Sequence, residues 1–209
     1  MTTGRVAIVD LGLGNLHSVV KAFERAGANA ELSADPDVLS RADRLVMPGQ
    51  GAFKECAHAL AGDIGEAVRS WIDSGRPYLG ICLGMQALFE SSEEAPGAKG
   101  LGIFRGTVKR FARDLHDAEG HRLKVPHIGW NQIDSIHPVF ENRAWYYFVH
   151  SFYCVPDEKS VVAATTDYGG PFCSAVARDN VLACQFHPEK SQDAGARVIS
   201  HFLGDVWWS

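Results

Sequence analysis

A cysteine between two glycines and a distant histidine–proline–glutamate segment give this chain the side chains of a nucleophilic catalytic site. The first segment is Gly80-Ile81-Cys82-Leu83-Gly84. It follows the apolar run Tyr78–Ile81, which predicts a strand, and it opens Leu83–Phe89, which predicts the start of a helix. A nucleophile at such a junction is typical of a nucleophile elbow, in which the flanking glycines let the chain turn sharply. The helix N-terminus favours a thiolate, because its free N–H groups point at the sulfur.

The second segment, His187-Pro188-Glu189, supplies a base and a carboxylate to orient it. Residues two apart on an extended segment project to the same side, so Glu189 can reach the imidazole of His187. Pro188 favours extended geometry in the residue before it. The carboxylate fixes the tautomer of the histidine, which activates the thiol and later protonates the leaving group. A lone cysteine is ordinarily a core residue, but the two segments together predict a catalytic triad of Cys82, His187 and Glu189.

The elements that must position these residues alternate between strand and helix in the first half of the chain. Alternation of this kind predicts a parallel sheet with helices on both faces. The expected strands are Arg5–Asp10, Ala28–Leu32, Arg44–Met47 and Tyr78–Ile81, and the expected helices are Asn15–Ala26, a short one opened by Asp35-Pro36-Asp37, and Phe53–Asp73 with a break near Gly62.

The second half carries closely spaced strand candidates separated by turn residues such as Gly169-Gly170-Pro171. They are Gly106–Phe111, His121–Val125, Trp145–Val155, Val161–Asp167, Cys173–Arg178 and Val181–Phe186, and a final helix is expected at Gln192–Leu203. Neither a repeat nor an interdomain linker is apparent. The expectation is one α/β domain spanning residues 1–209, with a central mixed, mostly parallel sheet flanked by helices.

Composition excludes several classes of function. A net charge of −5 without a long basic run argues against a nucleic-acid partner, and no apolar stretch is long enough to span a bilayer. The five cysteines lack disulfide or zinc spacing and there is no signal-peptide pattern, so we expect a cytoplasmic protein. Gly12-Leu13-Gly14 begins a dinucleotide-binding fingerprint, but His17 occupies its third glycine position. No cofactor and no metal are expected.

The two catalytic segments resemble those of the class I (triad) glutamine amidotransferases. Further segments resemble the branch that supplies ammonia for imidazole glycerol phosphate synthesis in histidine biosynthesis. These are Asp10–Leu16, Pro48-Gly49-Gln50-Gly51-Ala52-Phe53, Val125-Pro126-His127-Ile128-Gly129-Trp130-Asn131, Tyr147–Tyr153 and His187–Ser191. The resemblance runs from the first expected strand to the last expected helix.

The resemblance implies that Cys82 attacks the side-chain amide of L-glutamine and that a γ-glutamyl thioester is then hydrolysed. The ammonia would pass to a (β/α)₈-barrel cyclase subunit in a heterodimer, which makes imidazole glycerol phosphate and an aminoimidazole carboxamide ribonucleotide. It implies contact with L-glutamine for Gly49, Gly51, Gln86, His150, Ser151 and Phe152. It implies an interface with the cyclase for Asn15, Trp130, Asn131 and Lys190. Phe152 stands where the family commonly has tyrosine.

Elbow geometry predicts Leu83 N–H as the first donor of an oxyanion hole. The second is expected from Gln50 or Gly51, in the loop at the carboxyl end of the third strand, where open α/β sheets place their ligands. Gln50 replaces the apolar residue usual in the family.

Three alternative functions remain. They are a stand-alone cysteine hydrolase, an amidotransferase of the anthranilate or carbamoyl phosphate type, and a binding module that kept the fold. The sequence does not assign a role to Trp207 and Trp208.

Overall fold

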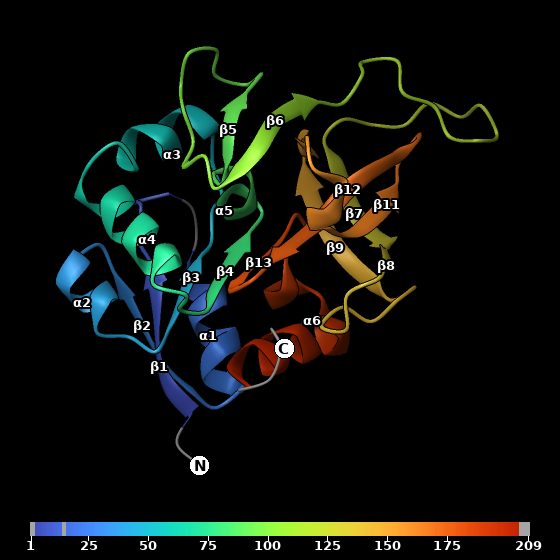
Figure 1. Ribbon diagram of the computed structural model, residues 1–209. Coiled ribbons are helices and arrows are strands. Elements are labelled where there is room, and N and C mark those ends of the chain that lie inside the picture. Colours follow the sequence, from blue (N-terminus) through green and yellow to red (C-terminus); the bar gives the residue numbers. More distant parts are fainter. Residues whose placement is uncertain (1–2, 14–15, 205–209) are drawn as a thin grey trace.

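The carboxyl ends of two neighbouring parallel strands bring both catalytic segments to one edge of a sheet. The computed structural model describes residues 3–13 and 16–204. Within them the main sheet has eleven strands, and a separate pair of strands lies beside it (Figure 1). Strand β4 (Tyr78–Ile81) pairs in parallel with β13 (Val181–Cys184), with Ile81 opposite Cys184. The residues that follow each strand therefore emerge side by side.

One half of the sheet is entirely parallel. It begins with β13 and β4 and extends to the edge of the sheet. Next come β3 (Arg44–Met47), β1 (Thr3–Val9) and β2 (Ala28–Ser33). All residues of β3, β4 and β13 are buried, as expected for apolar strands covered on both faces.

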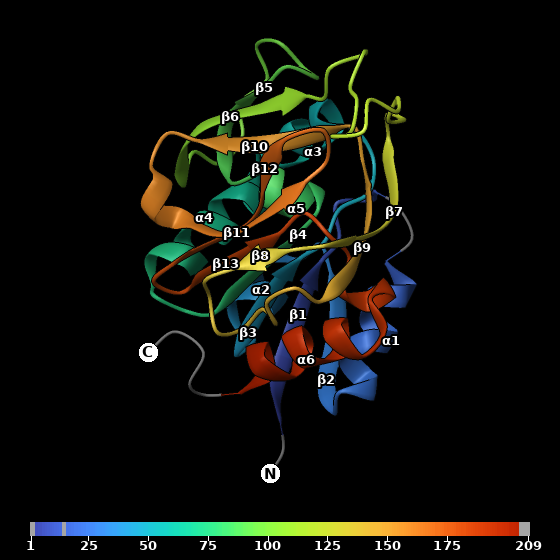
Figure 2. The same cartoon turned by 90° about the vertical axis from the view of Figure 1, so that its right-hand side faces the viewer.

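Helices cover the two faces of this half (Figure 2). On one face α1 (His17–Arg25) and α6 (Gln192–Leu203) pack together, with the rings of Phe23 and Phe202 edge to face at 6.2 Å. The other face is covered by α2 (Pro36–Ser40), α3 (Phe53–Ala59), α4 (Asp63–Asp73) and the short α5 (Leu83–Gln86). Two apolar cores result, one on each side of the sheet.

The other half of the sheet is mostly antiparallel. It runs from β13 through β12 (Pro171–Arg178), β10 (Phe152–Pro156), β6 (Phe104–Arg110) and β5 (Phe89–Ser92), and only the last pair is parallel. Strand β11 (Val162–Asp167) pairs with β12 and with β8 (Asp134–Ser135). The separate antiparallel pair is β7 (His127–Gln132) and β9 (Trp145–His150), and the 3₁₀ turns are η1 (Lys159–Val161) and η2 (Pro188–Lys190).

The predicted α/β fold with a mixed sheet and flanking helices is confirmed, and β3, β4 and α6 have the predicted bounds. Three local predictions are wrong. The helix after Cys82 ends at Gln86, and Phe89 starts a strand instead of continuing it. His121–Val125 is a loop with one isolated bridge, His116 to Arg122. The stretch Trp145–Val155 divides at Ser151 into β9 and β10, which belong to different sheets.

Candidate active site

The turn between β4 and α5 is strained at Cys82 itself. Cys82 has φ 54° and ψ −108°, a conformation that side-chain-bearing residues rarely adopt and that costs about 1–3 kcal/mol. Its N–H donates to the Cys184 carbonyl at 2.8 Å, and its carbonyl accepts from the N–H groups of Met85 and Gln86. These hydrogen bonds hold the strained turn, which leaves the side chain 8% exposed at the carboxyl edge of the sheet.

The two elbow glycines act through close packing and not through a left-handed conformation, because a positive φ occurs at neither. A Cβ on Gly84 would lie 1.8 Å from the Met47 carbonyl oxygen. A Cβ on Gly80 would lie 2.8 Å from the Gly84 carbonyl oxygen and 3.0 Å from the Ala183 side chain. The prediction that these glycines let the chain turn sharply is confirmed: without side chains at Gly80 and Gly84 the turn closes and α5 lies directly on β3 and β4, while Cys82 itself adopts the strained conformation.

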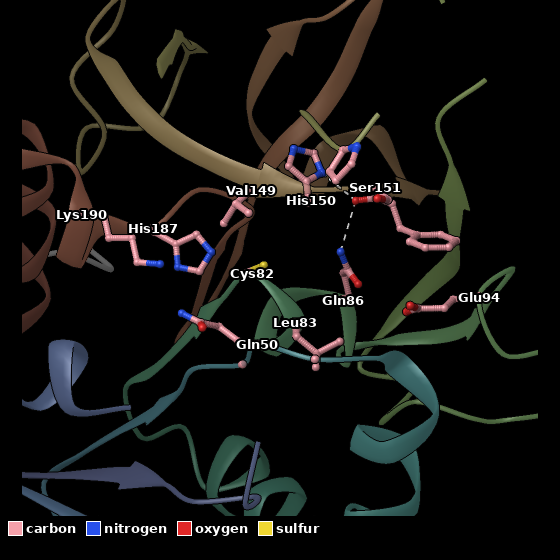
Figure 3. Close-up of a pocket in the computed structure, with 14 residues that line it drawn as sticks. Gln50, Cys82, Leu83, Gln86, Glu94, Val149, His150, Ser151, His187 and Lys190 are labelled. Atoms are coloured by element: carbon pink, nitrogen blue, oxygen red, sulfur yellow. Dashed lines mark hydrogen bonds between the residues drawn. The ribbon is translucent and has the colours of Figure 1, made fainter. Parts of the chain in front are cut away.

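His187 is held by hydrogen bonds on both its backbone and its ring. Its Nδ1 lies 2.7 Å from Glu189 Oε1, and both side chains are buried. Its N–H donates to the Tyr147 carbonyl at 2.9 Å, and its carbonyl accepts from the Ser191 hydroxyl at 2.6 Å. The same hydroxyl accepts from the Tyr147 N–H at 3.0 Å. Strand β9 thus locks the segment that follows β13, and the ring faces Cys82 (Figure 3).

The charges around His187 favour its protonated form. Burial works against an imidazolium, but the negative charge of a Cys82 thiolate and the Glu189 carboxylate outweigh it and raise the pKa of His187 to about 10. Nε2 is buried and has no hydrogen-bond partner among the described residues. Since Nδ1 is engaged by Glu189, Nε2 is the ring nitrogen free to exchange a proton with the sulfur or with a bound molecule.

A cavity of about 320 Å³ opens above the sulfur, which lies between His187 and Gln86 (Figure 3). The structure brings eleven of the residues singled out from the sequence to its wall: Gly49, Gln50, Gly51, Cys82, Leu83, Gln86, His150, Ser151, Phe152, His187 and Lys190. Glu189 lies behind His187 and does not line the cavity. The space can accept a small polar molecule in contact with the sulfur and the imidazole.

The cavity wall includes Leu83 and the loop at residues 49–51, which carry candidate backbone N–H donors. Leu83 is the first residue of α5, so its N–H has no acceptor within the helix. The loop after β3 packs tightly on it, because a Cβ on Gly49 would lie 2.6 Å from the Leu83 side chain. Gly51 has φ +127°, which glycine alone adopts readily. The loop can therefore place its own N–H groups close to that of Leu83.

Comparisons with known proteins agree with this geometry. A solved structure described as "Crystal structure of glutamine amidotransferase" has the same fold, with a TM-score of 0.74, 22% identity, and coverage of 95% of this chain and 96% of that chain. The "Imidazole glycerol phosphate synthase subunit HisH" of Syntrophotalea carbinolica is 51% identical over 207 residues, covering 96% of this chain and 100% of the relative. The protein of that name from Methylococcus capsulatus is 49% identical, covering 98% of each chain.

The family described as "Glutamine amidotransferase class-I" matches residues 7–206. The chain belongs to the class-I glutamine amidotransferase family. The resemblance drawn from the sequence is confirmed at the level of the family. As the relatives' name makes them subunits, a partner subunit is implied for this amidotransferase as well.

Two polar residues at the site of this amidotransferase were missed in the sequence. Glu94 lines the cavity, and its Oε2 accepts from the N–H of Phe53 at the start of α3. Gln185 is fully buried, and its Nε2 lies 3.5 Å from Cys82 Sγ. No sequence pattern identifies either, although Gln185 lies only two residues before His187.

A buried histidine pair contributes to the cavity wall, with His150 in the wall and His127 hydrogen-bonded to it. His150 Nδ1 lies 2.7 Å from the Phe152 carbonyl, so this nitrogen carries the proton. His150 Nε2 then accepts from His127 Nδ1 at 3.2 Å, which leaves His127 Nε2 to accept from Asn131 at 3.4 Å. Burial lowers the pKa of His127 to about 4 and that of His150 to about 3. Both rings are neutral, and His150 is a wall residue whose ring nitrogens are both occupied.

The residues expected at a partner interface are only partly grouped. Lys190 lines the cavity and lies 6.0 Å from the Tyr147 ring, whereas Trp130 is 42% exposed on β7. Asn131 turns its side chain inward, donating to the Asp167 carbonyl at 2.9 Å. Asn15 lies outside the described residues, as do Trp207 and Trp208.

Away from the cavity, the described part of the chain offers one group with metal-ligand spacing, Asp117, Glu119 and His121 in the loop between β6 and β7. His121 Nδ1 already lies 3.2 Å from Asp117 Oδ2. None of the helices described between residues 3 and 204 has the length and apolar character needed to cross a membrane.

Proposed function

We propose that this chain hydrolyses L-glutamine to glutamate and ammonia through a thioester on Cys82. It delivers the ammonia to a (β/α)₈-barrel cyclase subunit, with which it forms a heterodimeric imidazole glycerol phosphate synthase of histidine biosynthesis. The buried alignment of Cys82, His187 and Glu189 beneath one small cavity carries the proposal for the chemistry. The 51% identity to a protein named as a subunit of that synthase supports the pathway.

In the first step the Cys82 thiolate adds to the carbon of the glutamine side-chain amide. A sulfur–carbon bond forms, and the carbonyl π electrons move onto oxygen. Leu83 N–H, with an N–H of Gln50 or Gly51, donates to that oxygen; the loss of one such donor typically costs about 2.7–4 kcal/mol. His187 gives its Nε2 proton to the amide nitrogen, the carbon–nitrogen bond breaks, and ammonia leaves with a thioester remaining on the enzyme.

In the second step water replaces ammonia beside His187. The neutral Nε2 takes one proton from the water as its oxygen adds to the thioester carbon. The tetrahedral intermediate collapses and the carbon–sulfur bond breaks, which restores the thiolate and leaves the imidazolium in place. The new carboxyl group carries the second proton of the water and loses it to solvent as glutamate leaves. The Glu189 carboxylate stays ionised and orients the ring in both steps.

The remaining cavity wall holds the rest of the glutamine. Both N–H groups of the Gln86 amide are used within the protein, by the Phe152 carbonyl and by Gln185. Gln86 therefore offers its carbonyl oxygen to the substrate, as an acceptor for N–H groups. The Glu94 carboxylate is an acceptor for the α-ammonium group, and Ser151 offers a hydroxyl to the carboxylate. Phe152 contributes its backbone, with its ring 5.7 Å from the Arg110 guanidinium.

In this proposal the cyclase binds the face that carries β7 and the mouth of the cavity. Trp130 is an exposed aromatic side chain there, of the type that anchors interfaces. Lys190 lines the cavity and lies 6.0 Å from the Tyr147 ring, which Trp130 also contacts, so the proposal assigns it to the path of the ammonia. Asn15 and Asn131 complete the proposed contact set. The whole chain, residues 1–209, is proposed as one amidotransferase domain acting in the cytoplasm.

The test is glutamate release from L-glutamine by the purified chain, alone and with the cyclase and its nucleotide ligand. We expect a low rate alone and strong stimulation by the loaded partner, because the loop at residues 49–51 must present an N–H to the oxyanion. Equal rates in both conditions would mean a stand-alone hydrolase. The rate of glutamate release by the Gln50→Val complex, compared with that of the wild-type complex, reports on the same loop, since valine restores an apolar residue there.

A further inference from the structure

The hydrogen-bond partners of the Gln185 amide decide which of its ends carries the oxygen and which the nitrogen. This assignment starts from the Phe152 carbonyl, which is connected to Gln185 through the Gln86 amide. The Gln86 side chain reaches the Phe152 carbonyl at 3.2 Å, and a carbonyl can only accept, so the Gln86 atom facing it is Nε2. The same Nε2 lies 3.1 Å from Gln185, whose facing atom must therefore be the acceptor Oε1. The other end of the Gln185 amide is then NH₂.

That NH₂ group faces the reacting sulfur. Gln185 Nε2 lies 3.5 Å from Cys82 Sγ, and the Gln185 side chain is fully buried. An amide NH₂ is a donor only, so the contact favours a sulfur that accepts, which is the thiolate. Gln185 also does not line the cavity, so a bound substrate cannot reach it. Its one route to the chemistry is through the sulfur.

From this chain of contacts we infer that Gln185 is a thiolate-stabilising residue of the reaction, with its donor aimed at Cys82 by Gln86. The inference rests on the proposed role of Cys82 as nucleophile. His187 and Gln185 then act on the sulfur together, the first with a positive charge and the second with a neutral donor. The neutral donor stays in place when His187 gives up its proton to ammonia, so the returning thiolate keeps one partner throughout the cycle.

His187, Cys154 and Cys184 interact electrostatically with Cys82, and the charged side chains of Glu94 and Lys190 line the same cavity. Burial raises the pKa of Cys154 and of Cys184 well above its ordinary value, so both are neutral thiols near neutral pH. Neither competes with Gln185 as a stabiliser of negative charge.

The test is the pH dependence of iodoacetamide alkylation at Cys82, followed by peptide mass spectrometry on the full-length chain. Gln185→Met keeps a long apolar stem and removes the donor. We expect the pH of half-maximal alkylation rate to move up by about one to two units, from the usual strength of a hydrogen bond to a charged group. Gln185→Glu places an acceptor at the same distance and is expected to move it at least as far.

Ser174→Ala is the matched control. The Ser174 carbonyl accepts from the Gln185 N–H at 2.9 Å, and its buried hydroxyl has no hydrogen-bond partner in the described structure. Ser174→Ala changes a buried residue hydrogen-bonded to Gln185 without contacting the sulfur. The pH dependence of alkylation should therefore not move. An unshifted profile in both Gln185 variants, or an equal shift in Ser174→Ala, would reduce Gln185 to a packing residue and overturn the inference.

Two further readouts keep the test decisive. In the complex with the cyclase, Gln185→Met should lower kcat for glutamine by a larger factor than it raises KM, because Gln185 does not reach the cavity and Gln86 keeps its hydrogen bond to the Phe152 carbonyl. If Gln185→Met does not fold, Gln86→Leu replaces it: it removes the group that aims the donor and should shift the alkylation profile in the same direction. Alkylation needs no glutamine, so a failure of the proposed glutaminase activity would be seen separately.

Discussion

The Nδ1 atom of His187 lies 2.7 Å from Oε1 of Glu189, with both side chains buried at the edge where β4 and β13 end. The two residues come from a segment that follows β13, whereas Cys82 follows the neighbouring strand β4. Gln185 and Cys82 are 103 residues apart in the sequence, and the parallel pairing of these strands brings them into direct contact. The same pairing brings His187 close to Cys82.

Replacing Cys82 with alanine should remove the glutaminase activity and leave the ammonia-dependent synthase activity. Cys82→Ala should abolish glutamine-dependent product formation by the complex, because no thioester can form. Synthesis with ammonium salts should continue at close to the wild-type rate, since the cyclase then needs no glutaminase. The measurement is product formation with each nitrogen source. Loss of both activities would mean that Cys82 has a structural role.

Glu189→Gln should narrow the pH range of glutamate release and lower its rate by about 10²–10⁴-fold, the usual share of positioned acid–base catalysis. His187, with its pKa raised to about 10, keeps its proton at neutral pH and loses it as the pH rises through that value. Removing the carboxylate lowers this pKa, so the alkaline decline should begin at a lower pH. Glu158→Gln, at an exposed 4.0 Å ion pair with Arg178, is the control. An unchanged profile in Glu189→Gln would contradict the orienting role.

Gly84→Ala should destabilise the fold by about 1–3 kcal/mol, because its Cβ would fall 1.8 Å from the Met47 carbonyl oxygen and force α5 away from β3. Glutamate release should fall as well, since the shift displaces Leu83. Gly62→Ala is a suitable comparison, as no atom lies within 4 Å of the added methyl group; at this helix N-cap it should cost no more than about 1 kcal/mol. Urea denaturation of both variants gives the difference, and equal costs would refute the packing role of Gly84.

Acid should weaken the fold through the buried histidine pair. His127 and His150 have pKa values of about 4 and 3 in the fold, below the ordinary value, so the unfolded chain takes up protons first as the pH falls from about 6.5. Each contributes stability that is present above pH 6.5 and is lost towards pH 4 and 3.

His127→Gln removes one of these proton-binding sites. Its free energy of unfolding should therefore fall less steeply below pH 6.5, by up to about 1.4 kcal/mol per pH unit. The exposed His58→Gln serves as the control, and denaturant titrations at several pH values from 6.5 to 4 make the measurement. Parallel stability curves for wild type and His127→Gln would contradict the neutral state of the pair.

Sequence patterns predicted the elements that are buried on both faces and the residues that the catalytic chemistry requires. Arg44–Met47 and Tyr78–Ile81 are continuous apolar-rich runs between clear turns, and Gln192–Leu203 has a regular helical period, so their bounds were predictable. The helix after Cys82 was predicted too long because its residues suit a helix, while pairing with β6 extends the chain from Phe89.

The supporting side chains of the site depend on contacts that no local pattern records. Gln86 and Gln185 are 99 residues apart, and their roles follow from the direction of two amides. Glu94 reaches the cavity from the loop after β5, a strand that was itself not predicted. Strand β7 was also missed, because Gly129 interrupts it and its residues alternate only weakly between buried and exposed.

The most direct test of the account is to quench the cyclase complex with acid during turnover of L-glutamine and to map its cysteine peptides by mass spectrometry. The account predicts a γ-glutamyl adduct on the Cys82 peptide and on none of the peptides that carry the four other, buried cysteines. The adduct should be absent from Cys82→Ala. Glutamate release without any adduct on Cys82, or with an adduct on another cysteine, would contradict it.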